Sequence, residues 1–263
     1  MILYLLIILI LLYVACVYFR REGFEDTATT TEFKTFINEN IYNTFYTHIY
    51  DDIIHTIPHE TEVIKILSPY FHSNPNVLCV GSKTGHLVQL LSETTEVTGL
   101  DNSKAMVELS KKKYPKNKYV HGEYTDNTIF QENTFTIIMC PLFTIYRVDL
   151  ARFLDTTYRW VVHKGIVAIV FFKPGFNISQ IQNLDPTNYF KINYKHTIEL
   201  QNNNNNTIIE KIINSTGEVR TNKLYLNDIT ELSSIATDTG FKIVNTSDIP
   251  NMPNMCLLIL QKN

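Results

Sequence analysis

The feature that most limits the possible folds is an alternation of short apolar runs with amphipathic segments between residues 76 and 172. The pattern predicts buried strands at 76–80, 97–100, 118–121, 135–140 and 166–172, with helices at 85–91, 103–113 and 149–162. Strands that alternate with helices form a parallel sheet with helices on both faces. The expected fold class is therefore α/β, a doubly wound, Rossmann-like and mostly parallel sheet.

The pattern changes after Gly175. Extended segments near 190–200, 207–214 and 219–226, with the Asn-rich stretch 202–206 as an exposed loop, predict an antiparallel hairpin insertion. A helix at 228–238 and strands at 241–245 and 255–261 complete the chain, and helices are predicted at 33–49 and 59–71. Residues 33–263 suit one domain. Its expected parts are N-terminal helices (33–75), a core (76–175), the insertion (176–226) and a C-terminal helix with strands (227–263).

Residues 1–19 form an uncharged apolar run, MILYLLIILILLYVACVYF, which is followed at once by Arg20 and Arg21. As a helix this run would extend about 28 Å, close to the thickness of a bilayer core. A secretory signal peptide is the competing interpretation, but such peptides begin with basic residues and end at a small-residue cleavage site. We expect an uncleaved anchor at 1–19, a polar tether at 20–32 and a domain on the cytoplasmic side.

Composition excludes several other classes of protein. The chain has 263 residues, a formal net charge of -3 and 44% apolar residues, which is an ordinary globular balance. The slight negative charge disfavours a dedicated nucleic-acid partner. The four cysteines are far apart and no His or Cys pair has metal-ligand spacing, so no metal site is expected.

The segment most informative about function is the first strand–loop–helix, which ends in the glycine-containing loop Gly81–Gly85. Glycine lacks a Cβ and lets a ligand approach the backbone. About twenty residues later, Asp101 ends the second strand, where an acid can accept hydrogen bonds from a ribose diol. The alternative is a Rossmann-like domain in which these glycines only make a turn.

These motifs resemble those of the class I S-adenosylmethionine-dependent methyltransferases over about residues 40–263. VLCVGSKTG (77–85) resembles the first motif of that family, VLDxGxGxG, and VTGLDNSKAMVELSKKK (97–113) resembles the second. YVHGEYTDNTIFQENTFTIIMC (119–140) resembles the third and fourth motifs, and 160–170 resembles the segment that leads into the fifth strand. The anchor, the Asn and Ile bias and FTIYR (143–147) resemble membrane-anchored methyltransferase-like proteins of giant DNA viruses.

The resemblance implies S-adenosylmethionine as cofactor and assigns positions to its parts. Residues 81–85 would border the amino-acid end of the cofactor, Asp101 the ribose, and Asn102 and Met106 the adenine. Glu123 would stand at the adenine amino group. The implied cofactor-binding residues are Tyr50, Gly81, Ser82, Lys83, Gly85, Asp101, Asn102, Met106, Glu123, Tyr124 and Cys140. Tyr146 is the candidate catalytic residue, and Asp101 is expected at an exposed strand end.

Two departures from the family pattern bear on cofactor affinity. Cys79 replaces the acid of the first motif, and Lys83 replaces its middle glycine. Together they shift the local charge by two units beside a cofactor that carries a sulfonium and an ammonium, which predicts weak binding unless Lys83 pairs with the cofactor carboxylate. Two hypotheses therefore stand: a membrane-anchored methyltransferase with an unidentified small or macromolecular acceptor, or a non-catalytic binding module with a degenerate site.

Overall fold

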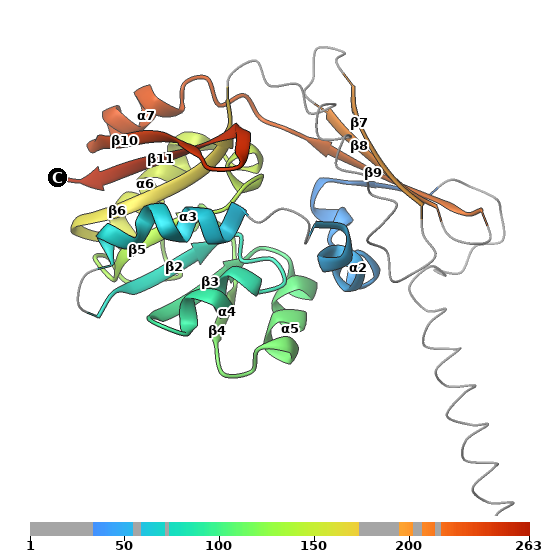
Figure 1. Cartoon of the computed structure of the whole chain (residues 1–263), viewed down its shortest axis with the longest axis horizontal. Helices are drawn as coiled ribbons and strands as arrows, with labels where there is room; N and C mark the ends of the chain where they lie inside the picture. Colours follow the sequence, from blue (N-terminus) through green and yellow to red (C-terminus); the bar gives the residue numbers. More distant parts are fainter. Residues whose placement is uncertain (1–33, 55–58, 72–73, 174–194, 202–206, 214–216) are drawn as a thin grey trace, which may run out of the picture.

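The structure is a computed structural model that describes residues 34–54, 59–71, 74–173, 195–201, 207–213 and 217–263 (Figure 1). Its helices and 3-10 turns are η1 (Asn38–Ile41), α2 (Thr44–Ile54), α3 (His59–Leu67), η2 (Ser68–Tyr70), α4 (His86–Ser92), α5 (Lys104–Lys113), η3 (Thr144–Arg147), α6 (Leu150–Trp160) and α7 (Leu232–Thr239). Its strands are β1 (Lys34–Ile37), β2 (Asn76–Val80), β3 (Glu96–Asp101), β4 (Lys118–His121), β5 (Phe135–Cys140), β6 (Val161–Phe172), β7 (Lys195–Gln201), β8 (Thr207–Ile213), β9 (Val219–Tyr225), β10 (Phe241–Ile249) and β11 (Met252–Lys262).

The large sheet has the strand order β10-β11-β6-β5-β2-β3-β4. The strands from β6 to β4 run parallel to one another, whereas β11 pairs antiparallel with both β6 and β10. The predicted mixed α/β sheet is therefore confirmed. Because β2 pairs with β3 on one side and β5 on the other, the winding of the chain reverses there, and ligands of such sheets bind beyond the carboxyl ends of the strands at that point.

The sheet is covered on both faces, as a parallel sheet requires. Figure 1 shows α3 and α4 in front of the sheet, with α6 and α7 on the other side. The central strand shows the consequence, since Val77, Leu78, Cys79 and Val80 have no exposed surface. An uninterrupted apolar run, rather than an alternating one, is therefore the sequence signature of β2.

A second, smaller sheet has the order β1-β9-β8-β7 and lies beside α2 (Figure 1). A buried polar network joins it to the N-terminal segment. The guanidinium of Arg220 donates from Nη2 to the carbonyl of Ile41 (2.8 Å) and from Nε to Asn222 Oδ1 (2.9 Å). Glu210 accepts from Asn222 Nδ2 (2.7 Å) and from the hydroxyl of Tyr46 (3.2 Å). This network fixes the small sheet against α2, at the edge of the site described below.

The predicted helix at 33–49 is wrong over its first part. Residues 34–37 form β1, which pairs in parallel with β9, and α2 begins only at Thr44. The apolar spacing at 33–49 fits a helix, but pairing with β9 and contact of the Phe36 ring with the Arg220 guanidinium, 3.9 Å from the ring centroid, favour the strand. The last sheet strand before the insertion also starts earlier than predicted, because α6 ends at Trp160 and β6 begins at Val161.

The predicted anchor (1–19), the tether (20–32), the Asn-rich loop (202–206) and the start of the first insertion strand lie outside the described residues. Within the part of the chain that the structure describes, no helix is long and apolar enough to cross a membrane. Both the anchor and its orientation therefore stay predictions.

Candidate functional site

The site begins at the loop between β2 and α4, at the reversal point of the sheet. The N–H groups of Gly81 and Ser82 both donate to the carbonyl of Leu100 in β3 (2.8 and 3.0 Å), which turns the chain sharply away from the strand. Gly81 has a φ of +80°, and a Cβ there would lie 2.2 Å from Thr144 Oγ1. Only glycine suits this position, because a side chain would be strained and would also displace the neighbouring η3 turn.

Lys83 occupies the middle of the loop with a φ of 52°, a conformation that non-glycine residues seldom adopt. Its backbone N–H donates to Asp101 Oδ2 (2.7 Å), and its carbonyl accepts from the hydroxyl of Ser110 (2.7 Å). Its Nζ donates to the carbonyl of Leu142 (3.1 Å) in the turn after β5. Burial lowers the pKa of Lys83, although the nearby Glu60 and Asp101 oppose that shift. The ammonium of Lys83 is therefore fixed between the β2–α4 loop and the turn after β5.

Asp101 ends β3 and is buried, with 4% of its surface exposed, so its expected position at an exposed strand end is wrong. Its carboxylate accepts from the N–H of Lys83 (2.7 Å) and from the N–H of Ser103 (2.9 Å). Burial raises the pKa of Asp101, whereas these hydrogen bonds and the charges of Arg147 and Lys83 lower it. A carboxylate has about four acceptor positions. Two are used by the backbone, which leaves capacity for the two hydroxyls of a ribose.

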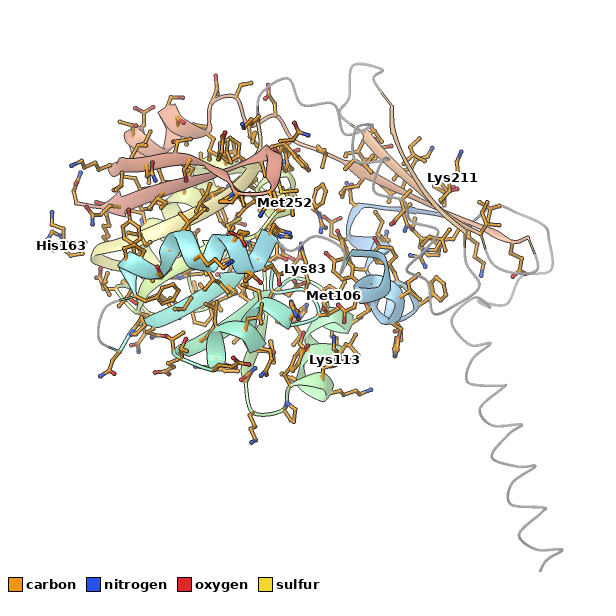
Figure 2. The ribbon with its side chains drawn as sticks, in the orientation of Figure 1. Lys83, Met106, Lys113, His163, Lys211 and Met252 are labelled. Carbon is orange, nitrogen blue, oxygen red and sulfur yellow. The ribbon has the colours of Figure 1, made fainter. Side chains whose placement is uncertain are left out.

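Asp101 lines a cavity of about 320 Å³ at the carboxyl ends of β2 and β3. Its lining residues are Tyr42, Gly81, Lys83, Asp101, Met106, Tyr124, Phe143, Thr144 and Arg147. Five residues expected at the cofactor from the sequence meet here: Gly81, Lys83, Asp101, Met106 and Tyr124. Figure 2 shows Lys83 and Met106 between the large sheet and α2. A ribose acceptor beside apolar and aromatic walls fits the nucleoside part of S-adenosylmethionine.

Several other expected residues support this cavity from outside its lining. Asn102 accepts from the hydroxyl of Tyr124 at Oδ1 (3.0 Å), and its N–H donates to the same hydroxyl (3.3 Å), so it positions the Tyr124 ring. Ser82 is buried within the loop, and Gly85 directly precedes α4 with a φ of 85°, where a Cβ would lie 2.6 Å from the hydroxyl of Tyr119. Glu123 is exposed and outside the lining.

Three more expected residues have other surroundings. The buried ring of Tyr50 lies below Lys83, whose Nζ is 5.8 Å from the ring centroid. Cys140 borders a second cavity, and burial raises the pKa of its thiol to about 12. Tyr146, the candidate catalytic residue, accepts a hydrogen bond from the N–H of Phe172 (2.8 Å) and lines neither cavity, so the structure gives no support to a role in proton transfer.

Sequence reasoning missed Arg147 and Tyr42, which close the first cavity. The guanidinium of Arg147 lies 4.5 Å from the centroid of the Tyr42 ring and 3.7 Å from Glu39 Oε1, and only 10% of the side chain is exposed. The available signal is the arginine that ends the segment FTIYR (143–147), directly after Tyr146. Tyr42 carried no signal, because η1 reaches the site only through the folded N-terminal segment.

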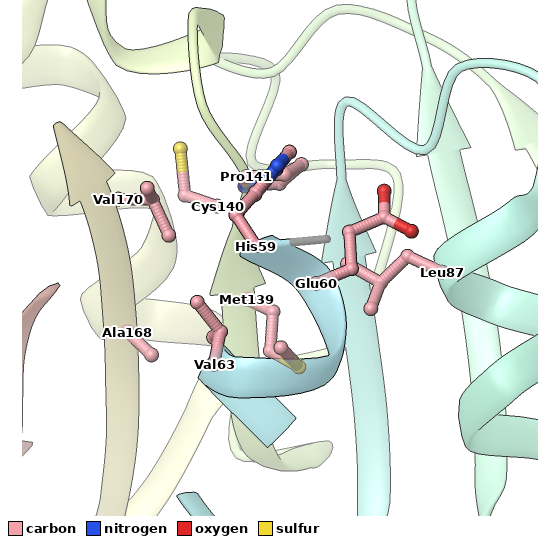
Figure 3. A pocket seen from close by; sticks show the side chains of 9 residues that line it. All are labelled: His59, Glu60, Val63, Leu87, Met139, Cys140, Pro141, Ala168 and Val170. Atoms are coloured by element: carbon pink, nitrogen blue, oxygen red, sulfur yellow. The ribbon is translucent and has the colours of Figure 1, made fainter. Parts of the chain in front are cut away.

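The second cavity, of about 230 Å³, is lined by residues of α3, α4, β5 and β6 and by the residue after β5 (Figure 3). Its lining residues are His59, Glu60, Val63, Leu87, Met139, Cys140, Pro141, Ala168 and Val170. Glu60 supplies a carboxylate whose Oε2 is 2.6 Å from His86 Nδ1 at the start of α4. Among the described residues, no group of three or more His, Cys, Asp or Glu side chains could hold a metal ion.

Asp51, which follows Tyr50 in α2, connects this helix to the site. Asp51 accepts a hydrogen bond from the hydroxyl of Thr84 and forms an ion pair with Lys113 at the end of α5. One carboxylate therefore connects α2, the β2–α4 loop and α5. We conclude that Asp51 stabilises the walls of the site.

Comparison with known proteins agrees with this architecture. Residues 78–169, which run from within β2 to within β6 and include Asp101 of the first cavity, match the family described as "Methyltransferase domain". A search of curated protein sequences gave no match. The chain therefore contains a methyltransferase domain over these residues, which supports a methyltransferase enzyme.

Solved structures with the same fold are distant in sequence. An S-adenosylmethionine-dependent methyltransferase from Clostridium acetobutylicum has a TM-score of 0.62 and 13% identity, over 83% of this chain and 98% of that one. The CcbJ methyltransferase of Streptomyces caelestis has a TM-score of 0.63 and 14% identity, over 86% and 99% of the two chains. CalS10 from Micromonospora echinaspora, an amino pentose methyltransferase solved with S-adenosylmethionine bound, has a TM-score of 0.58 and 14% identity, over 85% and 99%. At these identities the likeness shows the fold.

Proposed function

We propose that the chain is a membrane-anchored enzyme that transfers the methyl group of S-adenosylmethionine to an acceptor still to be identified, with its domain on the cytoplasmic side. The observation that carries the catalytic part is Asp101 in the cavity at the reversal point of the sheet. The membrane part rests on the apolar run 1–19 followed by Arg20 and Arg21. The resemblance to membrane-anchored giant-virus proteins supports the same arrangement.

S-adenosylmethionine would supply an electrophilic methyl group, its sulfur keeping the electron pair of the broken carbon–sulfur bond, and any proton lost by the acceptor would pass to solvent. Asp101 would accept the ribose hydroxyls, Met106 and Tyr124 would flank the base, and Gly81 would let the ligand reach the backbone. The protein contributes chiefly alignment and exclusion of water, since the leaving group is already good.

Calorimetry of the full chain with S-adenosylhomocysteine tests the cofactor assignment. We expect saturable binding of one ligand per chain, and transfer of label from methyl-labelled S-adenosylmethionine to an acceptor in an extract of the host cell. Absence of binding would contradict the proposed function and would favour the non-catalytic module.

Protease treatment of sealed microsomes that carry the full chain tests the topology. We expect the domain to be digested without detergent, because it would face the outside of the vesicle. A domain that is protected until detergent is added would show that the proposed orientation is wrong.

A further inference from the structure

The β2–α4 loop has a buried acid beside it that does not come from the loop itself. Glu60, in the first turn of α3, has 21% of its side chain exposed, and its Oε2 lies 2.6 Å from His86 Nδ1. The other oxygen, Oε1, accepts no hydrogen bond from any described residue. Burial raises the pKa of Glu60, but the hydrogen bond with His86 and the charges of His59, His86 and Lys83 lower it further, so the group is ionised near neutral pH.

Glu60 lines the second cavity together with Met139 and Cys140 of β5, the strand that pairs with β2, where the loop motif lacks an acid. Cys79 is fully buried in β2, and the charge of Glu60 adds to burial in raising the pKa of its thiol. Figure 3 shows Glu60 projecting from the start of α3 towards α4 and the adjoining end of the sheet. The fold therefore holds one negative charge at this end of β2, and α3 supplies it.

Lys83 reaches from the first cavity to the border of the second, because its Nζ donates to the carbonyl of Leu142 (3.1 Å), the residue after Pro141, which lines the second cavity. Lys83 lines the cavity of Asp101, and its charge interacts with both Glu60 and Asp101. A ligand that crosses the loop with a ribose at Asp101 would bring its other end to Glu60. In S-adenosylmethionine that end carries an ammonium and a carboxylate, so it needs an anion and a cation at short range. Glu60 and Lys83 provide that pair.

We propose that Glu60 of α3 receives the ammonium group of the cofactor, in place of an acid at position 79. This inference rests on the proposed function. This assignment explains how the chain can lack an acid in β2 and still keep the cofactor site, because the negative charge comes from the neighbouring helix α3 instead. It also changes the expected effect of Cys79→Asp, which would place a second carboxylate beside Glu60 and would not by itself tighten binding.

The test compares two ligands on the full chain by calorimetry. S-adenosylhomocysteine carries the amino-acid end, whereas 5′-methylthioadenosine has the nucleoside and lacks that end. Glu60→Gln keeps the shape of the side chain and removes its charge, so we expect S-adenosylhomocysteine to bind about 10- to 100-fold more weakly while 5′-methylthioadenosine is unaffected. Cys79→Asp combined with Glu60→Gln should restore at least part of the loss. Glu62→Gln, on the same helix but paired with Lys65, is the matched control and should change neither affinity.

Three outcomes would overturn the inference. Unchanged binding of S-adenosylhomocysteine to Glu60→Gln would remove Glu60 from the site. An equal loss for both ligands would show that Glu60 supports the fold of the pocket instead of contacting the amino-acid end. Failure of the wild-type chain to bind either ligand would overturn the proposed function and this inference with it, whereas binding of 5′-methylthioadenosine alone would overturn only the assignment of Glu60.

Discussion

Replacing Asp101 by alanine removes a cofactor contact and a structural contact at once, and the structure gives the size of each. If the carboxylate accepts the ribose hydroxyls, its loss should cost about 2–3 kcal/mol of cofactor binding, the scale of a hydrogen bond to a charged group. This corresponds to roughly a 30- to 150-fold rise in Kd. The carboxylate is buried and accepts from two backbone N–H groups, so the variant should also lose stability.

Two opposing effects determine how much folding stability the Asp101→Ala variant loses. The N–H groups of Lys83 and Ser103 lose their acceptor, at about 1–3 kcal/mol each if they stay buried and unpaired. Removal of a carboxylate whose pKa is raised by burial returns part of that cost, because ionising it in the folded state is unfavourable. We expect a net loss of about 1–3 kcal/mol, which lowers the melting temperature by roughly 2–4 °C for each kcal/mol in a domain of this size.

Calorimetry with S-adenosylhomocysteine below the melting transition separates the two effects. Asp126→Ala is the matched control, since Asp126 lies in an exposed turn where it accepts from Thr128. It should leave both affinity and melting temperature unchanged. A folded Asp101→Ala variant with wild-type affinity would refute the reasoning and would remove Asp101 from the cofactor site. An unchanged melting temperature would show that water replaces the lost acceptor.

Three further predictions concern the loop, the ion pair and the small sheet. Gly81→Ala should greatly weaken cofactor binding because its Cβ would lie 2.2 Å from Thr144 Oγ1, and Thr144→Gly in the same chain should restore part of the affinity by calorimetry. The hydrogen bond to Glu60 raises the pKa of His86. The stability that His86 adds, measured against His86→Ala, should therefore be fully present below the ordinary histidine pKa of 6.5 and should be lost as pH rises through the raised pKa. Melting curves of both proteins across that pH range measure this difference. Arg220→Ala should cost about 1–3 kcal/mol in chemical denaturation, because the buried side chain of Asn222 and the carbonyl of Ile41 lose their donor; an unchanged free energy of unfolding would contradict the structural role of the network.

The core of the fold could be predicted because its signals are local. Each buried strand of the parallel sheet is a short apolar run, and Ser103 marks the start of α5 by accepting from the N–H of Met106 (3.2 Å). β1 could not be predicted in the same way. Its residues have apolar spacing that suits a helix, and only pairing with β9, far along the chain, makes them a strand.

The site was predictable in part for the same reason. Gly81, Lys83 and Asp101 follow strand ends, so the topology alone brings them to one edge of the sheet. Glu60 and Tyr42 come from segments whose position depends on tertiary packing, and nothing in their sequence surroundings indicates a ligand. The burial of Asp101 was missed for a related reason, because the N-terminal segment covers the strand end through the hydrogen bond from Ser103 Oγ to the carbonyl of Tyr42 (3.0 Å).

The most direct test of the cofactor site is an experimental structure of the full chain with S-adenosylhomocysteine bound. We expect the ribose hydroxyls within hydrogen-bond distance of the Asp101 carboxylate, the base beside Met106 and Tyr124, and the ammonium at Glu60. A ligand bound elsewhere, or bound in this cavity with its ribose turned away from Asp101, would contradict this expectation.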